Sequence, residues 1–305
     1  MVFISGVFKI KSYFLHIKKR MLLSQIYVHP RDLRVSLVEG ENFRYYLIDG
    51  KKNEYLSTTE RLAVFWNKKF DKDRFWGPPG NPYRIAKEQL NIRACNFGTY
   101  SHKQFERYEN GLEFEYDPKW PKYHCYEDLP NWDKFMQFKA SLESYWKVFR
   151  TEWIVFTKTY NIASPVDVVY RDTRFPEKYV LMIVDYKTSK DPLSFYCDCK
   201  ERDDPNKQNP DPMQHTEDCS AVGRQPVTRD RMTRKCNKDF NQVCIYSKII
   251  EDLYGDKKNN IEIEVAQAIV VYLNPEWPLY IHTDDRHNFE AITEAIIKFQ
   301  EKKNK

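Results

Sequence analysis

The pattern of apolar and polar positions predicts a chain that uses both strands and helices. Short runs rich in β-branched and aromatic residues predict strands at Phe43 to Asp49, Glu152 to Phe156, Val166 to Tyr170, Tyr179 to Asp185 and Ile261 to Leu273. Helical spacing and cap signals predict helices at Thr59 to Phe70, Thr99 to Asn110, Asp133 to Phe149, Phe240 to Tyr254 and Phe289 to Phe299. This order predicts an α/β fold.

Local signals place some boundaries of these elements. Gly50 is a candidate hairpin corner, Thr58 a candidate helix cap and Gly255 a candidate helix end. Glycine and proline predict a loop at Phe75 to Tyr83. We expect a lead-in of strands and a helix over residues 1–95, then a core over residues 96–305 that carries a polar insertion at about residues 197–236.

The most informative stretch is the predicted strand that ends in Asp185-Tyr186-Lys187. Side chains alternate along a strand, so Asp185 and Lys187 point to the same side. A charge at the end of a buried strand is costly unless it has a partner. That partner is either a metal ion, with Lys187 holding a water or phosphate, or Lys187 itself in an ordinary salt bridge.

A second acid, Asp167, opens the neighbouring strand-like segment. Two adjacent strands can bring Asp167 and Asp185 to one cation. Magnesium prefers a few carboxylates with several waters, and such an ion lowers the pKa of bound water and stabilises charge on a phosphate.

Four motifs in order resemble those of the PD-(D/E)XK nuclease superfamily, in its RecB-like and lambda-exonuclease-like branch, with similarity to viral members. They are Gly98-Thr99-x-x-His102-x-x-x-Glu106, Ser164-Pro165-Val166-Asp167, Asp185-Tyr186-Lys187 and Gln242-x-x-x-Tyr246. The resemblance covers about residues 43–273. It departs at Ser164, where the family usually has glycine, which puts the exact geometry of the site in doubt.

The resemblance implies a restriction-endonuclease-like core, a central mixed β-sheet flanked by helices. It also implies Mg²⁺ or Mn²⁺ held by His102, Asp167, Asp185 and the main-chain carbonyl of Tyr186, with Asp167, Asp185 and Lys187 catalytic. Glu106 and Glu152 would support these ligands. Gln242 and Tyr246 would meet the nucleic-acid backbone. The bland alternatives are that His102 and Glu106 are surface residues and that Tyr246 belongs to the core.

Four cysteines of the insertion region, with His215, raise the question of a second metal. Cys197, Cys199, Cys219 and Cys236 could hold a structural zinc ion, but their spacing matches no standard pattern. An iron–sulfur cluster or unliganded thiols are the alternatives. The basic residues that end the same insertion (Arg224, Arg229, Arg231, Arg234 and Lys235) could hold phosphates or form a solvated loop.

Composition narrows these options only slightly. The net charge of +5 permits a nucleic-acid partner without arguing for one. No apolar run reaches the length of a membrane span and no secretory signal is evident, so we expect an intracellular protein with reduced thiols. The resemblance, and not the composition, implies a DNA exonuclease of repair, recombination or replication. The alternatives are an inactive nucleic-acid-binding module or an RNA endonuclease of the same fold. Oligomeric state is not specified.

Overall fold

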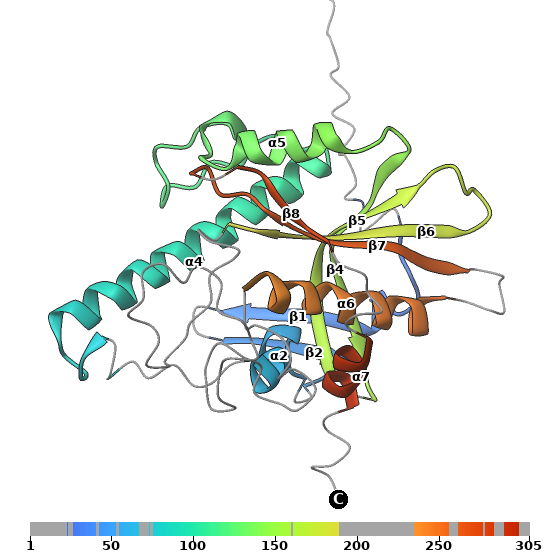
Figure 1. Ribbon diagram of the computed structural model, residues 1–305, viewed down its shortest axis with the longest axis horizontal. Helices are drawn as coiled ribbons and strands as arrows, with labels where there is room; N and C mark the ends of the chain where they lie inside the picture. The colour runs from blue at the N-terminus through green and yellow to red at the C-terminus, as the bar shows by residue number, and fades with distance from the viewer. Residues whose placement is uncertain are drawn as a thin grey trace, which may run out of the picture.

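The computed structural model describes residues 23, 27–40, 43–52, 55–66, 73, 76–159, 161–188, 235–255, 262–276, 278–283 and 290–298. They form the mixed α/β fold that the sequence predicts (Figure 1). In chain order the elements are η1 (Asp32–Arg34), β1 (Val35–Gly40), β2 (Phe43–Ile48), β3 (Lys51–Lys52), α2 (Thr58–Trp66), α4 (Pro82–Glu109), η2 (Tyr126–Asp128), α5 (Trp132–Ser141), β4 (Trp146–Thr157), β5 (Ile162–Asp172), β6 (Tyr179–Lys187), α6 (Lys235–Tyr254), β7 (Ile263–Tyr272), β8 (Tyr280–His282) and α7 (Glu290–Lys298).

The centre of the fold is a five-stranded mixed sheet in the order β4-β5-β6-β7-β8. β6 and β7 run parallel, whereas the other neighbouring pairs are antiparallel. A parallel pair cannot be joined by a tight hairpin, so the chain needs a crossover between β6 and β7. That crossover contains α6, which packs on both strands.

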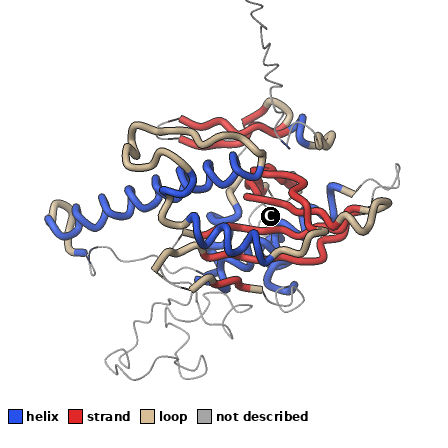
Figure 2. The backbone as a smooth tube through the Cα atoms, turned by 90° about the horizontal axis from the view of Figure 1, so that it is seen from above, coloured by secondary structure: helices blue, strands red, loops and turns tan. Residues whose placement is uncertain are grey.

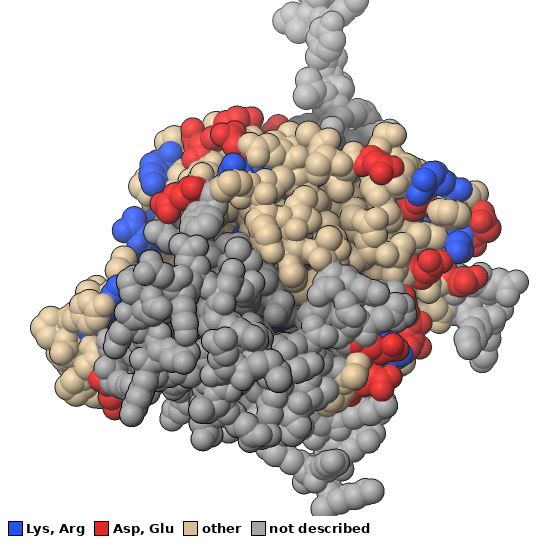
Figure 3. All heavy atoms as spheres, viewed as in Figure 1, with Lys and Arg blue, Asp and Glu red and all other residues tan. Residues whose placement is uncertain are grey.

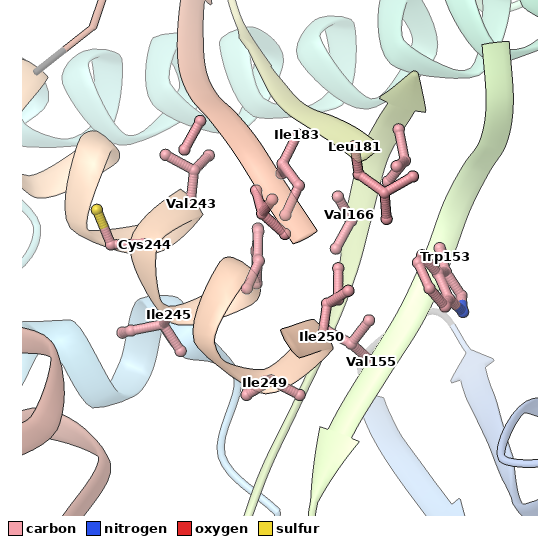
Figure 4. Packing of buried hydrophobic residues seen from close by; sticks show 14 of the residues in the cluster. Trp153, Val155, Val166, Leu181, Ile183, Val243, Cys244, Ile245, Ile249 and Ile250 are labelled. Carbon is pink, nitrogen blue, oxygen red and sulfur yellow. The ribbon is translucent and has the colours of Figure 1, made fainter. Parts of the chain in front are cut away.

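Helices cover both faces of this sheet. Leu181 and Ile183 of β6 face one layer, where they pack with Ile249 and Ile250 of α6 (Figure 4). Leu62 of α2 and Ala295 of α7 join the same cluster. The intervening residues of β6, Met182 and Val184, face the other layer, formed by α4, α5 and an aromatic connection between them. Because side chains alternate along a strand, both faces of β6 are buried.

A smaller three-stranded sheet, β1-β2-β3, packs at the end of β4 and β5. Tyr46 and Ile48 of β2 contact Phe156 and Ala163 there. The predicted strand at Phe43 to Asp49 and its turn are confirmed, because β2 ends at Ile48 and both Asp49 (φ 52°) and Gly50 (φ 72°) have positive φ. Positive φ at both central residues is what the type I′ two-residue hairpin turn requires.

The helix that carries His102 begins much earlier than Thr99, so that predicted start is wrong. α4 has 28 residues and begins at Pro82, where the Asn81 side chain caps the Tyr83 N–H at 2.8 Å. The predicted loop therefore stops at Asn81. Proline is favoured in a first helical turn because its missing N–H is not needed there. The N-terminal half of α4 extends past the sheet in both views (Figures 1 and 2).

Gly98 consequently lies inside α4 and does not form a tight entry to a helix. A Cβ atom at this position would come within 3.2 Å of Thr188 Oγ1, just after β6. Glycine here lets the helix approach the strand end that carries Lys187. Residues 95 and 96, the expected limits of the lead-in and the core, are also inside this one helix.

The predicted helix from Asp133 to Phe149 is only half right. α5 ends at Ser141, Leu142 takes an extended conformation, and the following residues enter β4 at Trp146. Phe149 is buried in the sheet, and β4 also starts six residues before the predicted Glu152. The last apolar residues of this helical pattern belong to β4 instead, because that segment pairs with β5. This pairing is a tertiary interaction that the local pattern does not reveal.

Smaller differences concern caps and the proline of the second motif. Ser57, and not Thr58, caps α2, because its Oγ accepts the Glu60 N–H at 3.2 Å and the Glu60 carboxylate accepts the Ser57 N–H. Pro165 lies within β5 opposite Ile154, and β5 pairs with β6 only from Val168 onwards. Proline is tolerated there because its strand has a partner on one side only. The predicted α6, β7 and α7 regions are confirmed.

Candidate active site

Residues from four separate elements of the fold converge near the end of β6 that carries Lys187. His102 and Glu106 come from α4, Asp167 from β5, Asp185 to Lys187 from β6, and Gln242 and Tyr246 from α6. The structure therefore brings together the residues that the four sequence motifs select. Two connected groups of contacts make up the site.

The first group centres on Asp185 and Lys187. Lys187 Nζ lies 2.5 Å from Asp185 Oδ2, and the Asp185 side chain is 2% exposed. Gln242 ties the two together, because its Oε1 accepts from Lys187 Nζ at 3.2 Å and its Nε2 donates to Asp185 Oδ1 at 3.2 Å. A side-chain amide can bridge an amine and a carboxylate because it has both an acceptor and donors.

Tyr246 supports Gln242 from one helical turn away. Gln242 Nε2 lies 2.5 Å from Tyr246 Oη, and Tyr246 Oη lies 3.1 Å from Ser164 Oγ. Tyr246 is fully buried within the core cluster under α6, so its ring packs as a core aromatic while its hydroxyl reaches the site. Ser164 is thus a hydrogen-bonding partner at the motif position where the resemblance leads one to expect glycine.

The second group centres on Asp167. Asp167 Oδ2 accepts the Tyr186 N–H at 2.7 Å and lies 3.4 Å from His102 Nδ1. The backbone of Tyr186, between Asp185 and Lys187, therefore connects the two groups. His102 is a quarter exposed and Asp167 is 14% exposed, so both face a partly solvated space.

Beside this second group lies a small cavity of about 10 Å³, lined by His102, Glu106, Glu109, Thr151, Glu152, Asp167, Val168 and Tyr186. That volume holds about one water-sized sphere. Glu152 has a positive φ of 45° within β4, opposite the position of Asp167. Non-glycine residues rarely adopt this conformation, and such strain concentrates at functional sites. Glu106 and Glu152 both line this cavity beside Asp167.

Glu109 is a site residue that the motifs did not select. Its side chain is 3% exposed, pairs with Lys139 Nζ at 2.8 Å and accepts from Tyr170 Oη at 2.6 Å. Tyr186 Oη lies 3.4 Å from the same carboxylate. The sequence could have indicated Glu109 by its position seven residues after His102, because this spacing places both residues on one helix face. The network fixes the ring of Tyr186, and thereby the backbone that holds Asp167.

The ionisation of the site follows from burial and from these pairs. Burial raises the pKa of Asp185 to about 7, although Lys187 opposes this shift and Asp167 adds to it. Burial lowers the pKa of Lys187, but the Asp185 carboxylate outweighs burial and the pKa lies above its ordinary value. Burial disfavours both charged forms of Asp167 and His102, yet their attraction prevails, so the pKa of Asp167 is lowered and that of His102 is raised.

The donor types suit a hard divalent cation, because two carboxylates, an imidazole and a backbone carbonyl are ligands that Mg²⁺ and Mn²⁺ accept. Among the described residues, however, no group of three or more His, Cys, Asp and Glu side chains gathers tightly enough to hold a metal ion. Lys187 supplies a positive charge beside Asp185, and His102 supplies one beside Asp167 when its imidazole is protonated. A metal at this site therefore requires the carboxylates to change partners.

The cysteine predictions lie mostly outside the described residues. The part of the chain that is not described includes Cys197, Cys199 and Cys219, together with His215 and the arginines of the insertion. Cys236 is in the first turn of α6, and its side chain is not described. Of the other cysteines, Cys95 is exposed, Cys125 is half-buried and Cys244 is buried.

Comparison with protein-family models and with curated proteins found no match to this chain. Within the described residues, no helix combines the length and apolar character needed to cross a bilayer.

Proposed function

We propose that the chain is a metal-dependent nuclease that hydrolyses DNA phosphodiester bonds, built on a restriction-endonuclease-like core. The observation that carries the proposal is the convergence of Asp167, Asp185, Lys187 and Gln242 from three elements, with His102 added from a fourth. The meeting of four separate sequence motifs at one strand end supports this proposal. The mixed sheet with helices on both faces is compatible with this core.

The roles follow from charge and position. Asp167, Asp185, His102 and the Tyr186 carbonyl would hold Mg²⁺ or Mn²⁺, which supplies stabilisation of charge on the reacting phosphate. The pKa of Lys187 lies above its ordinary value, so this side chain stays positively charged and would hold the scissile phosphate or orient the attacking water. Gln242 keeps Lys187 and Asp185 in register, and Tyr246 keeps Gln242 in place.

The decisive measurement is cleavage of end-labelled single- and double-stranded DNA in Mn²⁺. Lys187→Ala should lower the rate by about 100-fold or more, because a positioned charge beside the reacting phosphate is lost. Lys51→Ala, on the exposed strand β3, is the control and should cleave like wild type. Cleavage by Lys187→Ala at the wild-type rate would refute the proposal. A labelled RNA of the same sequence tests the RNA endonuclease alternative.

A second candidate is a nuclease-fold module that binds nucleic acid without cutting it. The observation that favours it is the pairing of Asp185 with Lys187 and of Asp167 with His102, together with the lack of a three-ligand group among the described residues. Basic and acidic side chains are also mixed on the face drawn in Figure 3, so charge there does not single out a DNA path. Wild-type protein that retards DNA in Mn²⁺ and leaves it intact would support this second candidate.

A further inference from the structure

A cavity of about 290 Å³ lies at the end of the five-stranded sheet away from Lys187. Its walls include Lys147 and Phe149 of β4, Arg171 of β5, Thr173 and the ring of Tyr27. Tyr179, which begins β6 and stacks under Arg171, is eight residues from Lys187. Eight strand residues span about 26 Å, so this cavity is separate from the candidate active site.

Two cations oppose each other in this cavity. Lys147 and Arg171 are direct partners in the antiparallel pairing of β4 and β5, which places their side chains on the same face. Like charges in this arrangement destabilise a sheet. Among the described residues, no acidic side chain lines the cavity, and the neighbouring Asp172 is buried and paired with Arg174 at 2.6 Å. An anion between Lys147 and Arg171 would relieve their repulsion.

The guanidinium group of Arg171 is held in place before any ligand arrives. Its Nη2 donates to the carbonyls of Phe175, Pro176 and Lys178 at 3.3, 2.9 and 3.4 Å, and its Cζ lies 4.2 Å from the centre of the Tyr179 ring. Because the guanidinium is already ordered, it would lose little conformational entropy on binding an anion.

Aromatic rings line another part of the cavity. The rings of Tyr27 and Phe149 lie 4.7 Å apart, and Tyr27 is 41% exposed. A planar base can stack on such an exposed ring while its phosphate meets the cations. We propose that this cavity binds a nucleotide, with the phosphate between Lys147 and Arg171 and the base against Tyr27. The proposal does not depend on nuclease activity.

Calorimetric titration of the full chain in EDTA tests this site without cleavage. We expect dAMP to bind saturably, and deoxyadenosine, which lacks the phosphate, to bind about tenfold more weakly or worse. Lys147→Glu should weaken dAMP about tenfold or more, since Lys147 is exposed and the new carboxylate would itself pair with Arg171. Lys51→Glu makes the same charge change on β3 and should bind dAMP like wild type.

A second variant separates the base from the phosphate. Tyr27→Ala should weaken dAMP about fivefold while leaving inorganic phosphate unchanged. Competition by an unphosphorylated (dA)10 strand would assign the site to the backbone of a nucleic acid, and its failure to compete would assign the site to free nucleotides. Absence of saturable dAMP binding up to about 10 mM, or equal binding by Lys147→Glu and wild type, would overturn the proposal. Because these measurements need no metal and no cleavage, they stand apart from the test of nuclease activity.

Discussion

The pairing of Asp185 with Lys187 has two consequences for the chemistry of single residues. The 2.5 Å contact keeps Lys187 charged, and burial still leaves the pKa of Asp185 at about 7. Asp185 therefore gains or loses its proton near neutrality, whereas an ordinary aspartate stays ionised there. Its ability to bind a cation should change over the same range.

We predict that Mn²⁺ binds more weakly as pH falls from 8 to 6. Below a pKa of about 7 Asp185 takes up a proton, and a metal must displace that proton, so affinity should fall by up to about tenfold per pH unit. Titration of metal-stripped protein with Mn²⁺ at several pH values measures this. Asp185→Asn should bind weakly at every pH, and Asp133→Asn, on the exposed side of α5, serves as the control. Equal affinity at pH 6 and pH 8 would contradict the prediction.

The same raised pKa affects stability without metal. The folded state keeps a proton on Asp185 up to about pH 7, whereas the unfolded chain releases it near the ordinary value of 3.8. Between about pH 3.8 and pH 7 the unfolded state therefore binds fewer protons than the folded state. Asp185 consequently lowers the free energy of unfolding as pH rises through this range. A bound cation would offset the loss by stabilising the ionised carboxylate.

At the scale of elements, the ion pair between Glu109 and Lys139 links α4 to α5. Glu109 is 3% exposed and also accepts from Tyr170, so its charge depends on Lys139 for compensation. The pair lies beneath Tyr186, which carries the backbone N–H that holds Asp167. The position of α4 against the sheet and the order of the candidate active site are therefore coupled.

Lys139→Met should lower the free energy of unfolding by about 3 kcal/mol, because it leaves the buried Glu109 charge without its partner. Adding Glu109→Gln should recover much of that loss, since the remaining amide is neutral and can still bond to Tyr170. Urea unfolding of the two variants and wild type provides the comparison. A loss of less than about 0.5 kcal/mol in Lys139→Met would show that the pair does not support the fold.

The ends of helices and strands were predicted correctly where a local turn or cap residue marks them. The Asp49–Gly50 turn and the end of α6 before Gly255 are examples, because backbone conformation at these positions depends on the residues themselves. It failed between Ser141 and Trp146, where helical spacing continues but the chain joins β4. The sequence also did not predict the start of α4 at Pro82. The glycines and prolines before it are typical of a loop, and Asn81 was not recognised as a helix cap.

At the scale of the whole molecule, Asp32 ties the segment before the small sheet to the large one. Its carboxylate accepts from Arg150 Nη2 at 2.6 Å and from Trp153 Nε1 at 2.8 Å, both on β4. Arg150 is 3% exposed, and burial lowers its pKa although Asp32 opposes that shift. Tyr46 and Ile48 bury the adjoining apolar surface.

We predict that Asp32→Asn lowers the free energy of unfolding by about 3 kcal/mol, because Arg150 would remain buried with its charge unbalanced. If the two sheets unfold together, circular dichroism and tryptophan fluorescence should report one coincident transition in wild type and variant. Two separated transitions in wild type would show that the sheets are independent. Asp133→Asn again provides a variant with the same chemical change at an exposed position.

The sequence by itself determined the α/β character, the candidate residues on β6 and α6, and the alternation that points Asp185 and Lys187 the same way. These depend on local periodicity and on short motifs, which the chain carries without reference to its partners. Only the tertiary structure decided that Gln242 bridges Asp185 and Lys187, that Glu109 supports Tyr186, and that Lys147 faces Arg171. Each of these contacts joins residues far apart in the chain, so its existence depends on strand register and helix packing, which no local pattern specifies.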